Sequence, residues 1–146
     1  MNTKSYHIYH NLLINTSAKK LFKAVSKPEE LVNWWPLKCS GEEQLNAVYN
    51  LNFTDTYNWF GKVITYKPNL AFHIQMTQSI TDWNPTSFGF DIEEISDNKV
   101  QLHFWHKNWQ ECNTEFKQSS FCWAMLLNGL KNYVEKGIII PFEERE

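Results

Sequence analysis

The sequence NTSAKKLFKAVSKPEELVNWW, residues Asn15–Trp35, carries the strongest structural signal in this chain. Thr16 or Ser17 can accept a hydrogen bond from the free amides of the turn that follows, as N-cap residues do. Residues Ala18–Val25 then place their apolar side chains on one stripe. This pattern predicts a short helix that packs one face against a core.

The second half of the same stretch predicts another short helix. Pro28 suits the first turn of a helix, because an N–H at that position would have no partner within the helix. Glu29 and Glu30 follow it and complement the positive end of the helix. The tandem Trp34-Trp35 then ends the stretch with two large apolar side chains.

Most of the remaining chain before the last quarter alternates apolar and polar residues, as half-buried strands do. The connections between the alternating segments are too short for crossover helices, so we expect antiparallel pairing. The alternation also predicts one buried face and one wet face. The expected strands are Tyr6–Ile14, Ala47–Phe53, Phe60–Tyr66, Leu70–Thr77, Ser87–Ile95 and Val100–His106.

The last quarter of the chain predicts one long helix, from near Glu115 to Lys136. Trp123, Leu130 and Val134 recur at the helical period, and Gly137 can take the left-handed conformation that ends a helix. The expected fold class is therefore α+β: a curved antiparallel sheet of about six strands wrapped around a long C-terminal helix, with two short helices after the first strand. At 146 residues we expect one domain over 1–146.

Composition narrows the class of protein. Aromatic residues make up 16% of the chain, which suits a sheet rich in wide side chains better than a helix bundle. The formal net charge is -2 and the basic residues are scattered lysines apart from Arg145, so we expect no nucleic-acid partner. No apolar run approaches the ~20 residues of a membrane-spanning helix, so we expect no membrane span.

The three cysteines, Cys39, Cys112 and Cys122, form no CxxC pair, and Met1–Tyr9 has no basic-then-apolar leader. We therefore expect reduced thiols and a cytoplasmic location. No cluster of His, Cys or Asp has the spacing of a zinc site, and no Gly-rich loop follows a strand. We accordingly expect no metal and no cofactor.

A set of landmarks spread along the chain points to a known family. They are Thr16-Ser17-Ala18, Leu21-Phe22, Ala24-Val25, Pro28-Glu29-Glu30-Leu31, Trp34-Trp35, Gly61-Lys62-Val63, Pro68, Leu70, Leu102–His106 and Trp123–Gly137. In their order and spacing the chain resembles the helix-grip (START-like) superfamily, and within it the branch related to the activator of the Hsp90 ATPase. The resemblance implies a cavity between sheet and long helix, which different members use for lipids, polyketides or hormones. This family usually carries a Gly pair where the chain has Asn46-Ala47, so we expect a less sharply bent strand start.

The inward aromatic side chains have two interpretations. They fill a dense core, as protein interiors usually do, or part of the set lines an apolar pocket with few polar groups. On the second interpretation the candidate ligand is a small hydrophobic or aromatic molecule. The candidate ligand-binding residues are Trp35, Tyr49, Phe53, Phe72, Ile74, Phe88, Phe90, Phe104, His106 and Trp123.

Two alternative functions remain open. His106 shares the inward face with Phe104 near a strand end, and with a free ring nitrogen it would orient a ligand or act as a base in a cyclase- or dehydratase-like reaction. No nucleophile with an adjacent base is evident, so we name no catalytic residue. Trp83, Trp105 and Trp109 are expected on the outer face or in loops, which suits a homodimer or a chaperone-binding module.

Overall fold

The computed structural model describes residues 4–145, and its centre is a seven-stranded antiparallel sheet. The strands lie in the order β1-β7-β6-β5-β4-β3-β2, which confirms the α+β class and the antiparallel pairing. The sequence predicted about six strands and missed β2, because three residues at a sheet edge show no alternation. The strands are β1 Tyr6–Ile14, β2 Lys38–Ser40, β3 Val48–Asn52, β4 Asn58–Lys67, β5 Ala71–Gln78, β6 Ser87–Ser96 and β7 Lys99–Trp109.

The two short helices are α1, Ala18–Ser26, and α2, Pro28–Leu31. The side chain of Ser17 caps α1 by accepting a hydrogen bond from the backbone N–H of Lys20, at 3.1 Å. After α2 the chain folds back, and the indole N–H of Trp34 donates to the backbone oxygen of Ala24 at 2.9 Å. The predicted helix pair is therefore confirmed, and the tandem tryptophans fix it to the core.

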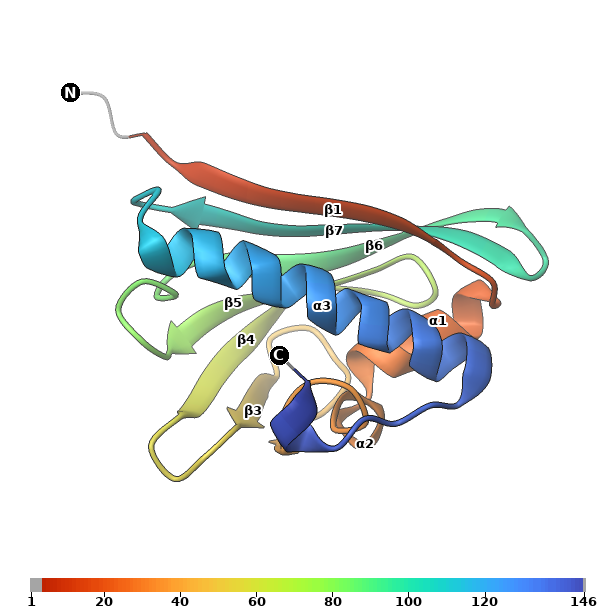
Figure 1. The fold of residues 1–146 in the computed structure, drawn as a ribbon, viewed down its shortest axis with the longest axis horizontal. Helices are drawn as coiled ribbons and strands as arrows, with labels where there is room; N and C mark the ends of the chain where they lie inside the picture. The colour runs from red at the N-terminus through yellow and green to blue at the C-terminus, as the bar shows by residue number, and fades with distance from the viewer. Residues whose placement is uncertain (1–3, 146) are drawn as a thin grey trace.

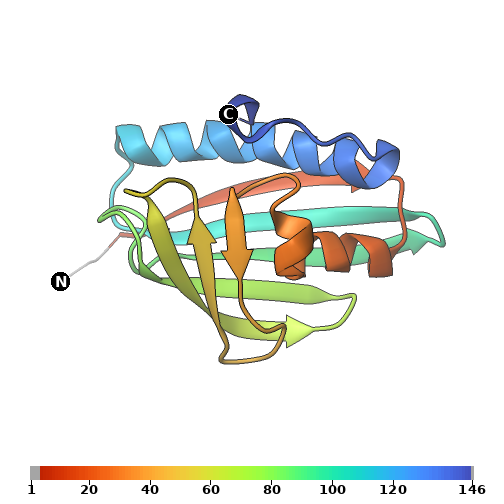
Figure 2. The same ribbon diagram turned by 90° about the horizontal axis from the view of Figure 1, so that it is seen from below.

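The long helix α3, Thr114–Lys136, crosses one face of the sheet (Figure 1). Asn113 caps its start by accepting from the N–H of Phe116 at 3.0 Å, and Gly137 ends it with a φ of 70°. Seen from below, α1 and α2 lie on the same side of the sheet as α3 (Figure 2). The chain then turns back along α3 to a short 3-10 helix η1, Phe142–Glu144.

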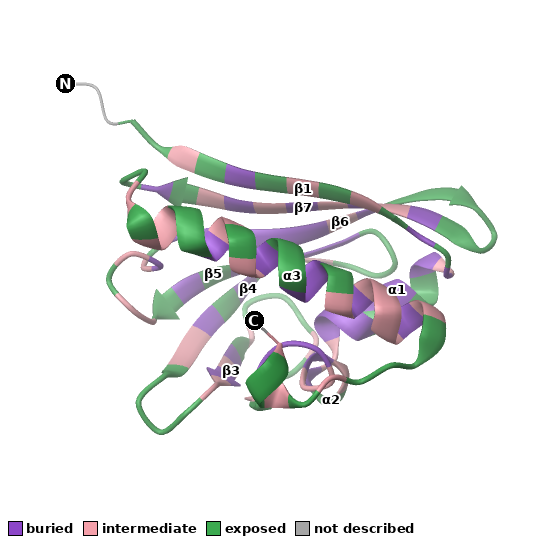
Figure 3. Cartoon of the chain, in the orientation of Figure 1, coloured by how far each residue is buried: buried purple, intermediate pink, exposed green. Residues whose placement is uncertain are grey.

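The core lies between the sheet and the inner face of α3, which is buried along its length (Figure 3). Trp123 is 1% exposed there, so its predicted inward position is confirmed. Trp83 lies in a loop, as expected, but it is buried because that loop folds under the start of α3. The expectation for Trp109 was wrong, because this residue ends β7 and is buried. Leu70, expected to begin a strand, belongs to the turn before β5 and is 60% exposed.

Asn46 stands near the start of β3 with a φ of 71°. Asn adopts this left-handed conformation more readily than other residues except Gly. The chain therefore keeps a left-handed residue just before this strand, and the less sharply bent strand start stays a prediction. No helix within residues 4–145 is long and apolar enough to cross a membrane. The cytoplasmic location stays a prediction. It was based partly on the segment Met1–Tyr9, of which Met1 to Thr3 lie outside the described residues.

Candidate functional site

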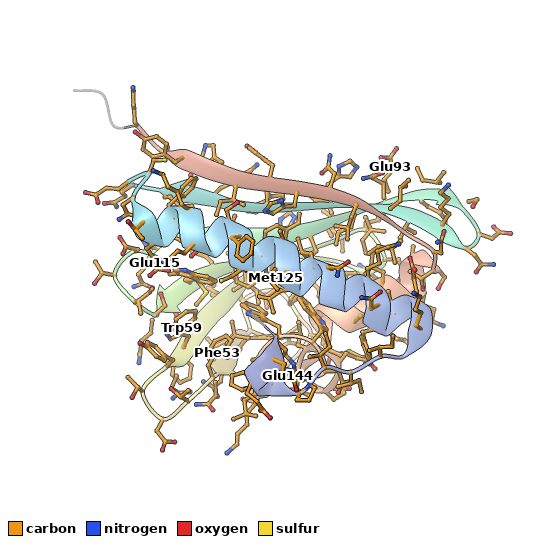
Figure 4. All side chains as sticks on the ribbon, in the orientation of Figure 1. Phe53, Trp59, Glu93, Glu115, Met125 and Glu144 are labelled. Atoms are coloured by element: carbon orange, nitrogen blue, oxygen red, sulfur yellow. The ribbon has the colours of Figure 1, made fainter. Side chains whose placement is uncertain are left out.

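A cleft of about 910 Å³ opens beside the N-terminal half of α3. Its other walls are the β3–β4 hairpin, the loop between β5 and β6, and the segment around η1. Figure 4 shows Phe53 and Trp59 at the hairpin, Glu115 at the start of α3 and Glu144 on η1. The lining residues are Trp35, Phe53, Thr54, Tyr57, Trp59, Ile80, Trp83, Glu115, Lys117, Gln118, Ser119, Phe121, Cys122, Trp123, Leu126, Phe142, Glu143 and Arg145.

Five of these lining residues form a closed ring of aromatic contacts, which we call the aromatic ring of the cleft. Successive ring centroids are 5.8 Å apart for Trp35 and Phe53, 5.0 Å for Phe53 and Trp59, 4.8 Å for Trp59 and Trp83, 6.0 Å for Trp83 and Trp123, and 4.8 Å for Trp123 and Trp35. These separations are those of favourable aromatic pairs. Because four separate segments supply the members, the ring fixes these walls of the cleft to one another.

Local hydrogen bonds hold the two ring members of the β3–β4 hairpin, Phe53 and Trp59, in place. The hydroxyl oxygen of Thr54 accepts from the N–H groups of Thr56 and Tyr57, at 3.2 and 3.0 Å. The N–H of Phe53 donates to the backbone oxygen of Tyr57 at 2.9 Å. Thr side chains commonly stabilise turns in this manner. The turn therefore brings Phe53 and Trp59 to the same side of the hairpin.

A short chain of hydrogen bonds lines the wall at the start of α3. The indole N–H of Trp83 donates to the hydroxyl oxygen of Ser119 at 3.1 Å. That hydroxyl donates in turn to a carboxylate oxygen of Glu115, also at 3.1 Å. The Glu115 carboxylate lies in the first turn of the helix, where negative charge is favoured. This wall is polar at its rim and apolar below it.

Arg145 lies at the opposite wall. Its Nε donates to the backbone oxygen of Ile140 at 2.9 Å, and its Nη1 donates to the backbone oxygens of Trp35 and Pro36, both at 3.3 Å. The guanidinium carbon lies 5.8 Å from the centre of the Phe142 ring. Partial burial lowers the pKa of Arg145, which is nevertheless charged at any physiological pH.

His106 lies outside the cleft, in the closed core behind Trp123. Its Nδ1 accepts from the indole N–H of Trp123 at 3.0 Å, and its Nε2 lies 2.7 Å from the hydroxyl of Thr86. An indole nitrogen only donates, so Nε2 carries the ring proton and donates to Thr86. Burial lowers the pKa of His106 to about 3, so the ring is neutral. The free ring nitrogen that a role in ligand binding or catalysis requires of His106 is therefore missing, because both nitrogens already have partners.

The outer face of the sheet carries a separate polar cluster. His73 and Trp105 each bond to the carboxylate of Asp91, at 2.6 and 2.9 Å. Gly89 separates the two rings, and a Cβ there would lie 2.4 Å from atoms of both. The outer-face position expected for Trp105 is confirmed. Within residues 4–145, no three His, Cys, Asp or Glu side chains gather in a group that could hold a metal ion.

Comparison with protein families gives a match that covers residues 15–135. The matching family is described as "Activator of Hsp90 ATPase homolog 1-like protein". The chain belongs to this family. The resemblance inferred from the landmarks of the sequence is therefore confirmed.

Solved structures agree with the family assignment. The Aha1 dimer from Colwellia psychrerythraea is 25% identical, with a TM-score of 0.82 over 90% of this chain and 98% of the other. A conserved protein of unknown function from Enterococcus faecalis is 15% identical, with a TM-score of 0.79 over 99% of this chain and 82% of the other. A Staphylococcus saprophyticus protein is 15% identical, with a TM-score of 0.77 over 93% of this chain and 96% of the other. A comparison with curated protein sequences gave no match.

Within this member of the Hsp90-activator-like family, the ten candidate residues divide between two places. Trp35, Phe53 and Trp123 line the cleft. The other seven lie in the closed core, because α1 and α3 cover the sheet face that carries them: Tyr49, Phe72, Ile74, Phe88, Phe90, Phe104 and His106. The sequence reasoning missed Tyr57, Trp59 and Trp83. Their signal was available in the aromatic density of the β3–β4 hairpin and of the β5–β6 loop.

Proposed function

We propose that residues 1–146 act as a single domain that binds a small hydrophobic or aromatic molecule in the cleft. The observation that carries the proposal is the aromatic ring of the cleft, which faces an open volume of about 910 Å³. Ligand sites in proteins commonly span about 300–1,000 Å³ and are lined by apolar and aromatic side chains with a few polar groups. The Glu115–Ser119 wall and Arg145 supply such polar groups here.

Exposure of apolar rings inside the cleft supports the same function. Tyr57 is 48% exposed, Phe53 and Trp59 are half-buried, and all three line the cleft. Apolar surface gathered in a concave site gains free energy when a ligand removes it from water. The closed core offers no such gain, because its aromatic side chains are already covered.

A titration with the neutral apolar dye phenylnaphthylamine tests the proposal, because its fluorescence rises in apolar surroundings. Two substitutions form a matched pair. Trp59→Ala removes a half-buried Trp from the cleft, and Trp105→Ala removes a half-buried Trp from the outer face of the sheet. We expect Trp59→Ala to weaken dye binding roughly tenfold, since one aromatic contact contributes up to about 1.5 kcal/mol. Trp105→Ala should bind the dye as the parent protein does.

The outcome that contradicts the proposal is equally definite. A folded parent protein that shows no saturable dye binding up to its solubility limit would refute it. Equal losses in both variants would place the dye somewhere other than the cleft. Circular dichroism on each variant shows whether the fold is retained.

A second candidate function, homodimerisation, is favoured by the outward face of α3. Residues 118–130 of this helix contain no charged side chain, and Phe121 and Met125 are 66% and 43% exposed. Uncharged apolar patches of this kind are typical of interfaces, and the similar Colwellia psychrerythraea structure is a dimer. Light scattering tests this candidate. Met125→Glu should yield monomers, whereas Ile64→Glu, on an exposed strand position, should leave the mass unchanged.

The cyclase- or dehydratase-like alternative has less support. His106, the base it would use, has partners at both ring nitrogens in the closed core. Glu115 lines the cleft but already accepts a hydrogen bond from Ser119. Binding without a chemical step is therefore the function that the geometry favours. No feature of residues 4–145 adds support for a chaperone contact.

A further inference from the structure

The cleft contains the only arginine of the chain, Arg145. Its hydrogen bonds to the backbone oxygens of Ile140, Trp35 and Pro36 use Nε and Nη1. Within residues 4–145, no hydrogen bond or ion pair engages Nη2. The three bonds therefore fix the guanidinium in one orientation and leave its second amino group available.

The charge of Arg145 lacks a carboxylate partner among the described residues. Its three acceptors are neutral backbone oxygens. The exposed Glu143 raises the pKa of Arg145 through its charge but makes no ion pair with it. The guanidinium is partly withdrawn from water, which lowers the pKa of Arg145. A fixed, partly desolvated cation of this kind favours an anion at its free edge.

The other charged groups of the cleft differ from Arg145. Glu115 is held by Ser119 at the helix start, where the helix dipole stabilises its charge. Lys117 and Glu143 are exposed, and water screens their charges. Among the charged residues that line the cleft, Arg145 is therefore the cation held in place by the fold.

The position of Arg145 joins it to the aromatic ring of the cleft. The same Trp35 whose backbone oxygen accepts from Nη1 contributes its indole to that ring. Phe142 lies beside the guanidinium on the other side. A flat ligand stacked on the ring would thus have one edge near the guanidinium.

We propose that the cleft selects aromatic acids, meaning molecules with a flat apolar body and one anionic group. The body packs on the aromatic ring, and a carboxylate or sulfonate oxygen accepts from Nη2 of Arg145. This inference rests on the proposed function, since it names the class of ligand for the same cleft. A cationic aromatic ligand is disfavoured, because it would place like charge against the fixed guanidinium.

Two dyes with one ring skeleton provide the test. Anilinonaphthalene sulfonate carries an anionic group, and phenylnaphthylamine is the same skeleton without it. We expect the parent protein to bind the anionic dye roughly tenfold more tightly, as one hydrogen bond to a charged group provides. Arg145→Gln should remove this preference while leaving the affinity for the neutral dye within about twofold.

Two further variants separate charge recognition from the structural role of the three backbone bonds. Arg145→Lys retains the cation but loses the forked donor geometry, so it should keep a preference of roughly threefold. Lys117→Gln removes an exposed cation from the same cleft and should leave the preference within about twofold. If Arg145→Gln weakens both dyes equally, Arg145 only holds the chain in place and the inference is wrong.

The two proposals fail in distinguishable ways. Equal binding of both dyes by the parent protein, unaffected by Arg145→Gln, would overturn the selection of acids and leave the binding cleft standing. Absence of binding by either dye would overturn both. A preference that persists in Arg145→Gln and disappears in Lys117→Gln would show that Lys117 holds the anionic group. It would overturn the role proposed for Arg145.

Discussion

Helix α3 covers two aromatic regions that differ in kind. Behind it, Phe88, Phe104 and His106 belong to a closed core in which each is at most 1% exposed. Beside its N-terminal half, the aromatic ring forms part of the wall of an open cleft. Trp123 belongs to both regions, since its ring centroid lies 4.4 Å from that of Phe104 and 4.8 Å from that of Trp35. The two regions therefore share Trp123 as a wall, but the core is closed and the cleft is open.

The difference comes from the parts of the fold that supply the side chains. The core residues come from paired positions on neighbouring strands, where strand pairing brings them together directly: Phe88 pairs with His106 and Phe90 pairs with Phe104. The cleft residues come from strand ends, loops and the segment around η1, which meet with less regular geometry. Regular scaffolds fill their centres, and binding sites form on the loops around them.

The first prediction concerns the wall that both regions share. Trp123→Ala should lower the free energy of unfolding by about 3–5 kcal/mol, because it deletes a fully buried Trp and leaves a cavity. Phe121→Ala, two residues away on the exposed side of α3, should change it by less than about 0.5 kcal/mol. Urea melts of the two variants measure the difference. Similar small losses in both would mean that α3 packs on the sheet through another face.

The second prediction uses the closed region alone. His106 is neutral in the folded protein, where burial lowers its pKa to about 3, whereas in the unfolded chain its pKa is near 6.5. The unfolded state thus binds an extra proton over this window, and stability falls as pH falls. Between pH 7.5 and 5 the free energy of unfolding should drop by about 2 kcal/mol.

Urea melts across that range measure the effect. His103→Gln, on the outer face of the sheet, should retain the decline, and His106→Gln should flatten it at a lower overall stability. The lowered pKa of Asp91 acts only at more acidic pH, since its contribution is lost as pH falls through the carboxylate range. A parent protein whose stability is constant over the window would show that His106 is exposed to water.

The sequence predicted the closed region better than the open one, for a physical reason. Strand alternation identified Phe88, Phe104 and His106 as inward, because inward direction within a strand depends only on period two. Whether an inward side chain is covered depends on the path of distant segments, and no local pattern encodes that path. The sequence therefore predicted which residues point inward, but it left open whether they fill the core or line a pocket.

The cleft residues illustrate the same limit from the other side. Trp83 was expected in a loop or on the outer face, and the loop was correct but the exposure was not, because a bond to Ser119 on α3 draws it inward. Arg145 could be found in the sequence as the single arginine but not placed, since only the folded chain brings it to Trp35. Sequence order fixes the elements, and tertiary contacts decide which of their ends meet.

The last prediction compares one hydrogen bond from each region. Thr86→Val leaves the Nε2 proton of His106 without an acceptor in the closed core, so we expect a loss of about 1–3 kcal/mol. Ser119→Ala removes the acceptor of the Trp83 indole N–H at the wall of the cleft, where water entering the cleft can replace the hydroxyl. Its cost should stay below about 1 kcal/mol. Urea melts measure both, and a loss in Ser119→Ala as large as that in Thr86→Val would show that the cleft wall is as dry as the core.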